Sequence, residues 1–281
     1  MKLIECPRDA MQGLHDFIPT EIKAEYINKL LKVGFDTIDF GSFVSPKAIP
    51  QLKDTVQVLE KLELSSSRSK LLAIVANIRG VQDAVLHEQI SYLGFPFSVS
   101  ETFQKRNTNS SIAESLTTVE ELTNLCSKHN KTAVVYLSMG FGNPYGDAWS
   151  NEIVEHLAAE LVNRGVKILS LADTTGVSTA NKISYLFTNL VKQFPAVEWG
   201  VHLHSTPSSW KEKIDAAYKG GCKRFDSALK GLGGCPMASD NLTGNIATEN
   251  VIYYLEEQGE KLGLNMDAWH DAMAFSGRVF N

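Results

Sequence analysis

Short runs of apolar and β-branched residues alternate along the chain with longer stretches whose apolar residues recur every three or four positions. The short runs are typical of buried strands and the longer stretches of amphipathic helices. The predicted strands are Lys2–Cys6, Phe35–Phe40, Leu71–Ala76, Ile90–Phe95, Thr132–Ser138, Lys167–Leu171, Val197–His202 and Lys223–Ser227. The predicted helices are Pro19–Val33, Pro46–Leu62, Val81–Glu88, Ile112–Lys128, Ser150–Arg164, Thr179–Lys192, Pro207–Lys219, Thr248–Glu257 and a last helix, Met266–Phe280.

This order of elements predicts the fold class. Strands that alternate with helices form parallel sheets, because each helix carries the chain back to the start of the next strand. Eight such units in 281 residues fit a closed (β/α)8 barrel, the TIM barrel, better than an open doubly wound sheet. Ser65–Ser69 is predicted as a surface loop, and no linker interrupts the pattern. We therefore expect one α/β catalytic domain over residues 1–281, closed by a C-terminal helix.

Composition narrows the function classes. The chain is 43% hydrophobic and 21% charged with a net charge of −5, which are ordinary globular values. Without a basic stripe, nucleic acid is not an expected partner. The apolar runs are much shorter than the roughly 20 residues of a membrane span, so no membrane partner is expected. None of the four cysteines is spaced Cys-x-x-Cys, which favours a reducing compartment and predicts a cytoplasmic location.

Two histidines stand at the end of the seventh predicted strand. Because side chains alternate between the faces of an extended chain, His202 and His204 share the inward face with Glu198 and Gly200. Two imidazoles so placed can converge on one metal ion, and the plainer alternative is two unrelated histidines. Barrels of this class keep their chemistry at the carboxyl ends of the strands, and this position favours the metal site.

Two oxygen donors join these imidazoles. Asp9 follows the first predicted strand, beside Arg8, and Asn245 lies in the loop after the eighth. Taken alone, Asp9 fits a surface Arg–Asp pair and Asn245 a turn asparagine. Together the four residues make a mixed oxygen and nitrogen set that suits Mg²⁺ or Mn²⁺, with Zn²⁺ as an alternative. Because Asp9 is the one anionic ligand, the site would stay positive and attract an anionic small molecule.

One thiol lies on a glycine-rich segment. Gly231–Pro236 reads Gly-Leu-Gly-Gly-Cys-Pro, and glycine permits the positive φ angles of a tight, flexible loop. The loop presents Cys235, whereas Cys126 and Cys222 lie in apolar runs typical of buried structural cysteines. A thiol held over a site is a candidate proton donor or nucleophile, and a structural cysteine is the alternative.

Several motifs, in order along nearly the whole chain, resemble the 3-hydroxy-3-methylglutaryl-CoA (HMG-CoA) lyase family. The motifs are Pro7-Arg8-Asp9, Ser42 to Lys47, Ser100 to Phe103 with Lys105 to Asn107, Ser170 to Thr174, His202-Leu203-His204, and Gly231 to Pro236 with Gly244-Asn245. The glycine–cysteine loop is the most specific motif, because it separates the lyases from the synthases and aldolases of the same barrel superfamily. The resemblance implies a (β/α)8 barrel that cleaves HMG-CoA to acetyl-CoA and acetoacetate with a divalent cation.

The resemblance also implies roles for individual residues. Those that resemble the family's metal ligands are Asp9, His202, His204 and Asn245. Those that resemble or neighbour its catalytic groups are Arg8, Asp39, His202 and Cys235. Those in segments that contact the acyl-CoA substrate are Ser42, Lys47, Asn107, Ser170 and Asp173. A homodimer is implied as well. The cleavage needs a base for the substrate hydroxyl, and the sequence leaves Asp39 and His202 both open.

Departures from the family pattern keep other functions open. Asp39 and Ile4 stand where the family has glutamates, Cys6 where it has glycine, and Ser205 where aspartate is usual. One alternative is therefore a related lyase, aldolase or synthase acting on another hydroxyacyl-CoA or on a 4-hydroxy-2-oxo acid. A second alternative is a metal-binding protein that binds a CoA ester without catalysis.

Overall fold

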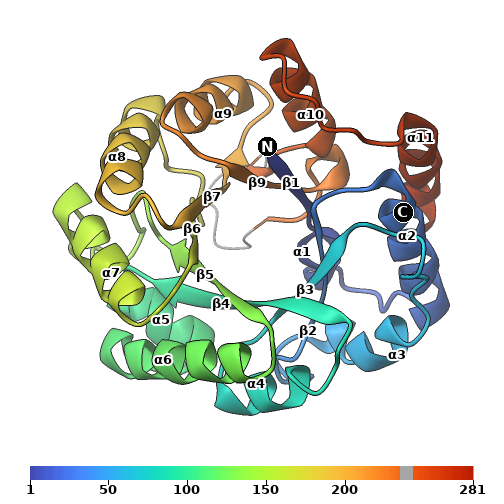
Figure 1. Ribbon diagram of the computed structural model, residues 1–281, viewed down its shortest axis with the longest axis horizontal. Coiled ribbons are helices and arrows are strands. Elements are labelled where there is room, and N and C mark those ends of the chain that lie inside the picture. The colour runs from blue at the N-terminus through green and yellow to red at the C-terminus, as the bar shows by residue number, and fades with distance from the viewer. Residues whose placement is uncertain (235–242, 281) are drawn as a thin grey trace.

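Eight parallel strands close a barrel in the part of the chain that the computed structural model describes, residues 1–234 and 243–280. The helices form a ring around the barrel (Figure 1). The barrel strands, in their order around it, are β1 (Lys2–Glu5), β2 (Thr37–Ser42), β3 (Lys70–Ile74), β4 (Ile90–Ser98), β5 (Thr132–Ser138), β6 (Ile168–Ala172), β7 (Glu198–His202) and β9 (Arg224–Ser227). The predicted (β/α)8 barrel with a C-terminal helix is thus confirmed.

The helices follow the strands in chain order. They are α1 (Pro7–Gln12), α2 (Thr20–Val33), α3 (Thr55–Leu59), α4 (Ile78–Ala84), α5 (Glu101–Thr108), α6 (Ile112–Lys128), α7 (Asn151–Asn163), α8 (Ala180–Gln193), α9 (Trp210–Lys219), α10 (Thr248–Glu257) and α11 (Met266–Phe275). Side-chain caps fix several starts: Ser111 forms a capping box with Glu114 at the start of α6. No helix in the described residues is long and apolar enough to cross a membrane.

Several predicted helices have other bounds in the structure. The helix predicted as Pro207–Lys219 begins at Trp210, and the one predicted as Met266–Phe280 ends at Phe275, before the 3-10 turn η3 (Ser276–Arg278). The segment predicted as Pro46–Leu62 forms the 3-10 turn η1 (Pro50–Leu52) and the short α3, because Pro50 disfavours helical backbone at Ile49 and interrupts the hydrogen-bond ladder. The helix predicted at Val81–Glu88 begins earlier, at Ile78, where the Asn77 side chain caps it. Two short helices, α1 and α5, were not predicted, because six to eight residues are too few to show a helical period.

The interior of the barrel changes from apolar to polar along its axis. Outward-facing strand residues such as Trp199 and Val201 belong to the main hydrophobic core beneath the helices. Leu72, Val134 and Ile168 form a separate apolar cluster inside the barrel. Polar side chains crowd the carboxyl ends of the strands, and chemistry is expected there.

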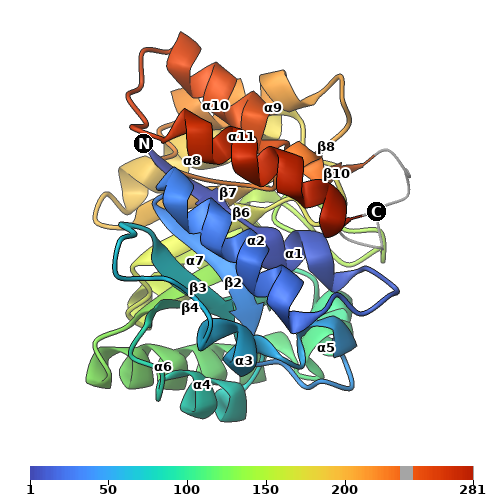
Figure 2. The same cartoon turned by 90° about the vertical axis from the view of Figure 1, so that its right-hand side faces the viewer.

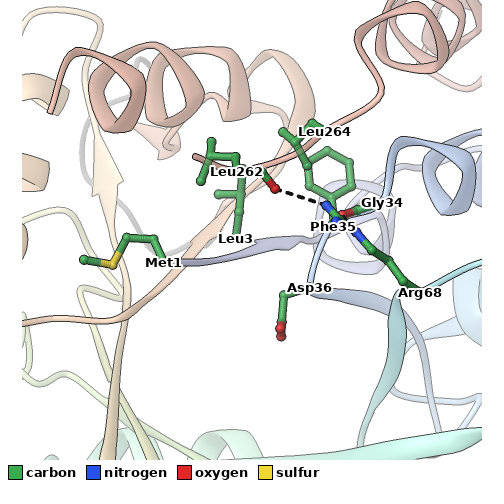
Figure 3. A pocket seen from close by; sticks show the side chains of 8 residues that line it. All are labelled: Met1, Leu3, Gly34, Phe35, Asp36, Arg68, Leu262 and Leu264. Atoms are coloured by element: carbon green, nitrogen blue, oxygen red, sulfur yellow. Dashed lines mark hydrogen bonds between the residues drawn. The ribbon is translucent and has the colours of Figure 1, made fainter. Parts of the chain in front are cut away.

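The C-terminal helix closes the barrel's outer layer. Helix α11 lies beside α2 (Figure 2). Lys29 pairs with Asp271 at 2.7 Å, and the rings of Phe35 and Trp269 meet edge to face with centroids 6.0 Å apart. At the amino end of the barrel, Arg68 lines a hollow and donates hydrogen bonds to backbone carbonyls, Leu262 among them (Figure 3). The hollow lies at the end of the barrel opposite the polar side chains. The hydrogen bonds of Arg68 join the segment after α2 to the segment before α11 there.

A buried carboxyl group makes the stability of the fold depend on pH. Glu5 on β1 faces the helix layer, where it accepts hydrogen bonds from the Leu229 N–H and the Thr248 hydroxyl. Burial raises the pKa of Glu5 to about 8, from an ordinary value of 4.5. The folded state therefore binds this proton more tightly than the unfolded state, so Glu5 destabilises the fold progressively as the pH rises from 4.5 toward 8.

We expect Glu5→Gln to remove this dependence. The amide keeps an acceptor for the Leu229 N–H and never ionises, so the variant should gain stability relative to the wild type at pH 8 and little at pH 5. Urea unfolding of both proteins at the two pH values measures the difference. If the free energy of unfolding changed equally in both proteins between pH 5 and pH 8, Glu5 would not ionise in the folded state over this range.

Candidate active site and metal centre

The carboxyl ends of β1, β2 and β7 bring together most of the predicted catalytic residues. Arg8 and Asp9 lie on α1, the short helix that begins two residues after β1 ends. Asp39 projects from β2, and His202 is the last residue of β7. All four are wholly or largely buried, so their charges act in a medium of low polarizability and interact strongly.

Two of these side chains, Asp9 and His202, form a candidate metal centre together with His204. One ligand atom each from Asp9, His202 and His204 lies within 4.8 Å of the others. The Arg8 and His202 charges outweigh the effect of burial and hold the pKa of Asp9 below its usual range, so it is a carboxylate. One carboxylate and two imidazoles are suitable donors for a divalent cation.

Both imidazoles engage Nδ1 with other groups, which leaves Nε2 as the nitrogen that can bind a metal. The Thr174 carbonyl oxygen accepts a hydrogen bond from His204 Nδ1–H at 3.0 Å. The buried Nε2 of His204 has no partner among the described residues. His202 Nδ1 lies 3.3 Å from Asp226 Oδ2. When Nδ1 carries the proton, the lone pair on Nε2 is free to bind a metal.

The pKa values of the two histidines shift in opposite directions. Burial and the neighbouring His202 lower the pKa of His204 to about 4, so it is neutral at pH 7. Burial opposes ionisation of His202 too, but its hydrogen bond to Asp226 and the Asp9 carboxylate outweigh it and raise the pKa of His202. A cation at this centre would therefore take the place of a proton on His202.

The chain brings His204 to the centre by a route that strand alternation does not describe. The barrel strand ends at His202, and His204–Ser205 forms β8, which pairs antiparallel with β10 (Gly244–Asn245). Asn245 lies directly opposite His204 in this pair. The predicted end of the strand at His202 is thus confirmed, but the alternation that placed His204 on the same face does not continue past it. The two rings still lie 5.4 Å apart between centroids.

Asn245 lies at the edge of the centre. Its Nδ2 donates to Asp9 Oδ2 at 2.6 Å and to the Leu232 carbonyl at 2.9 Å. To act as a ligand through oxygen, the amide would have to turn by half a revolution, which exchanges the positions of its oxygen and nitrogen and gives up both hydrogen bonds.

Arg8 and Asp39 form a buried ion pair beside the centre. Arg8 Nη2 lies 2.5 Å from Asp39 Oδ2, and Nε also donates to both carboxylate oxygens. The remaining nitrogen, Nη1, donates to Asp9 Oδ1 at 3.2 Å and to Gln12 at 2.8 Å. Burial raises the pKa of Asp39 to about 6 despite the Arg8 charge, a value suited to exchanging protons near neutral pH.

The predicted substrate-binding residues are more scattered. Ser170 is buried inside the barrel, and its Oγ has no partner among the described residues. The Ser42 hydroxyl accepts from Val44 N–H at 3.2 Å. The Asp173 carboxylate is engaged with Ser178 and with Lys213, whose Nζ lies 3.0 Å away, so it braces the loop after β6.

Lys47 and Asn107 are exposed, in the segment after β2 and on α5. Cys235 lies outside the described residues. The glycines before it are packed tightly: Gly233 has φ +80°, and a Cβ there would lie 2.7 Å from Ala10 Cα and 2.8 Å from Asp9 O. The loop thus begins in contact with the segment that carries Asp9.

Sequence reasoning missed two residues that touch the site. Gln12 donates to Asp9 Oδ1 at 2.8 Å and accepts from Arg8, which ties these two side chains together. Its spacing of three and four residues from them would have placed it on their face, had α1 been recognised as a helix. Asp226 contacts His202 from a neighbouring strand, and its inward position at the end of β9 was the available signal.

Comparison with known proteins adds an independent observation. Residues 3–275 match the HMGL-like family model. The chain is 34% identical to the hydroxymethylglutaryl-CoA lyase of Bacillus subtilis, over 93% of this chain and 86% of that protein. It is also 34% identical to the human cytoplasmic 3-hydroxy-3-methylglutaryl-CoA lyase, over 100% of this chain and 75% of the human protein.

A solved structure agrees with these relatives. The structure of an HMG-CoA lyase from Acinetobacter baumannii, in complex with coenzyme A and 3-methylmalate, superimposes with a TM-score of 0.89 at 29% identity, over 99% of this chain and 90% of that one. The match extends over the whole barrel and includes every strand that carries a site residue. The chain belongs to the HMGL-like family of carbon–carbon lyases.

Proposed function

We propose that this protein is a divalent-metal-dependent lyase that cleaves 3-hydroxy-3-methylglutaryl-CoA to acetyl-CoA and acetoacetate. The observation that carries the proposal is the cluster of Asp9, His202 and His204 at the mouth of the barrel, with donor atoms within 4.8 Å of one another. Relatives of that activity match the whole chain, and one solved relative binds coenzyme A.

The residues present fit a divalent cation. The buried Nε2 of His204 lacks a partner among the described residues, and a buried donor or acceptor without a partner costs about 1–3 kcal/mol. The proposed ligands are Asp9, His202, His204 and Asn245, a set that suits Mg²⁺ or Mn²⁺, with Zn²⁺ as the alternative. Such a cation acts as a Lewis acid that makes a bound hydroxyl easier to ionise.

The charges of the site favour an anionic substrate. Arg8 and Asp39 neutralise each other, and Asp9 offsets one of the two charges of a cation. About one positive charge would remain, in a buried setting that strengthens its attraction for a carboxylate or thioester oxygen. Substrate contacts are further proposed for Ser42, Lys47, Asn107, Ser170 and Asp173.

Asp39 is the proposed base for the substrate hydroxyl. With Nδ1 of His202 directed to Asp226 and Nε2 as the proposed ligand atom, neither His202 nitrogen would retain a free lone pair once a cation is bound. An Asp39 carboxylate, with its pKa raised by burial to about 6, can accept the proton on Oδ1 or Oδ2. Ionisation of the hydroxyl then forms the ketone of acetoacetate, and the electron pair of the broken C–C bond becomes the enolate of acetyl-CoA.

Arg8 is proposed to stabilise this enolate at the thioester oxygen, and Cys235 to protonate its carbon. A guanidinium stays charged at every relevant pH and offers several N–H donors in a fixed plane. Arg8 is held in place by Asp39, Asp9 and Gln12, so its orientation is set before the substrate binds.

The Arg8→Lys variant should therefore lose turnover. Lysine keeps the charge, but its three donors on one nitrogen cannot replace the five donors of the planar guanidinium, which contacts Asp39, Asp9 and Gln12 before any substrate binds. We expect kcat to fall about 10²–10³-fold, the usual cost of one oxyanion donor, with a smaller change in KM. Steady-state kinetics of the purified variant measure the split. A KM effect with kcat unchanged would limit Arg8 to binding.

The protein is further proposed to work in the cytoplasm as a homodimer, by analogy with its family. The direct test of function is an activity panel after chelator treatment. We expect cleavage of HMG-CoA to require added Mg²⁺ or Mn²⁺ and to yield acetyl-CoA and acetoacetate in equal amounts by mass spectrometry.

Two alternatives have distinct outcomes in the same panel. The shorter Asp39 and the buried Ile4 favour testing other hydroxyacyl-CoA esters and 4-hydroxy-2-oxo acids, and faster cleavage of one of these would change the assigned substrate. Tight binding of CoA esters with no turnover at any metal would contradict catalysis.

A further inference from the structure

Asp226 lies behind His202 in the barrel and has no role in the steps described above. The register of β7 and β9 sets Asp226 opposite His202. Its Oδ2 lies 3.3 Å from His202 Nδ1, and its side chain is entirely buried. Asp226 Oδ1 has no hydrogen-bond partner among the described residues, so His202 is the one side chain there that hydrogen-bonds to this carboxylate.

The contact with Asp226 selects the orientation of the His202 ring. An imidazole that directs Nδ1 at a carboxylate keeps its proton there and leaves the lone pair on Nε2. The Tyr136 ring meets the imidazole edge to face at 6.1 Å, and the His204 ring does so at 5.4 Å. These ring contacts limit tilting, but they do not distinguish the two nitrogens. Asp226 does.

A buried cation lies next to Asp226 on the same strand. Arg224, two residues earlier on β9, is also fully buried, and its side chain crosses the barrel over Gly200, where a Cβ would lie 3.2 Å from Arg224 Cδ. The Arg224 guanidinium attracts the Asp226 carboxylate. Facing groups from other strands are the Cys6 thiol and the Asp39 carboxylate.

We propose that Asp226 is a positioning residue that holds His202 with Nε2 directed at Asp9 and His204, and so sets the affinity of the centre for a divalent cation. The inference rests on the proposed ligand role of His202. Carboxylates that orient metal-binding histidines typically contribute 10–100-fold to metal affinity.

The test is a titration of the purified protein with Mn²⁺, in which electron paramagnetic resonance measures the concentration of the free ion. Asp226→Asn keeps the side-chain volume, but its NH₂ group can present a donor to Nδ1 and favour the proton on Nε2. We expect Mn²⁺ to bind this variant about 10–100-fold more weakly than the wild type. The readout needs no turnover.

Asp54→Asn is the matched control. Asp54 is another buried carboxylate with one ionic partner, Lys23 at 2.7 Å, and its side-chain hydrogen bonds go to Lys23 and Thr20 on α2 and to none of the proposed ligands. We expect this control to lower the midpoint of thermal unfolding and to leave Mn²⁺ affinity unchanged. Loss of affinity in both variants would indicate general loosening and overturn the specific role of Asp226.

The outcomes separate this inference from the proposed function. A wild-type protein that binds no Mn²⁺ contradicts the metal centre itself. A wild type that binds Mn²⁺ and an Asp226→Asn variant that binds it equally well contradict only the positioning role.

A second measurement covers the case in which Asp226→Asn does not fold. Histidine ¹⁵N spectra of the wild type with Mg²⁺ report the tautomer of each ring, and the His202 signals are assigned by their loss in His202→Gln. We expect the proton on Nδ1 of His202. A proton on Nε2 would overturn the proposal.

Discussion

Asp9→Ala is expected to abolish both the bound cation and turnover. Asp9 is the anionic donor in the cluster with His202 and His204, and it also accepts from Arg8, Gln12 and Asn245. Its loss would leave two neutral imidazoles and one amide around a dication, beside the Arg8 charge, and the attraction of the site for a cation would be lost. Metal content after dialysis and cleavage of HMG-CoA measure the two effects.

Asp16→Ala is the matched control for this prediction. Asp16 is also an acidic residue near the amino terminus, but its side chain is fully exposed to solvent. The control should retain the metal content and turnover of the wild type. Full metal content in Asp9→Ala would refute the ligand role of Asp9, and loss of metal in both variants would point to damage to the fold.

Cys235→Ser is expected to lower kcat about 10²–10⁴-fold while metal and substrate still bind, the usual scale of general acid catalysis. A hydroxyl is a much weaker acid than a thiol, so it transfers its proton to an enolate carbon less readily. Gly233, two residues before Cys235 in the sequence, is in contact with the Asp9 segment.

The control is Cys126→Ser, because Cys126 is buried on α6 away from the carboxyl ends of the strands. We expect this change to affect stability and to leave kcat unaltered. Near-normal kcat in Cys235→Ser, with the metal bound, would exclude the thiol from the reaction.

The sequence predicted the barrel because each of its parts has a local signal. Buried strands of parallel sheets are short apolar runs, and helices such as α6 show the helical period over many residues and carry their own capping residues. Ile112–Lys128 and Thr132–Ser138 were predicted with the bounds that the structure shows. Short elements such as α1 lack enough residues for such a signal.

The candidate site was predictable only in part. Residue type and position at the carboxyl end of a predicted strand indicated Asp9, Asp39 and His202 as candidate site residues. The ring orientation of His202 depends on Asp226, a contact between residues 24 positions apart in the sequence, and no local pattern reports it. The pairing of β8 with β10, which places His204 opposite Asn245, likewise joins two segments that are far apart in the sequence.

The most direct test of the metal centre is anomalous diffraction from crystals of the protein grown with Mn²⁺. The account predicts one anomalous peak at bonding distance, about 2.0–2.3 Å, from a carboxylate oxygen of Asp9 and from Nε2 of His202 and His204, with the Asn245 amide oxygen turned toward it. A peak elsewhere, or none at a concentration of Mn²⁺ that supports cleavage of HMG-CoA, would contradict it.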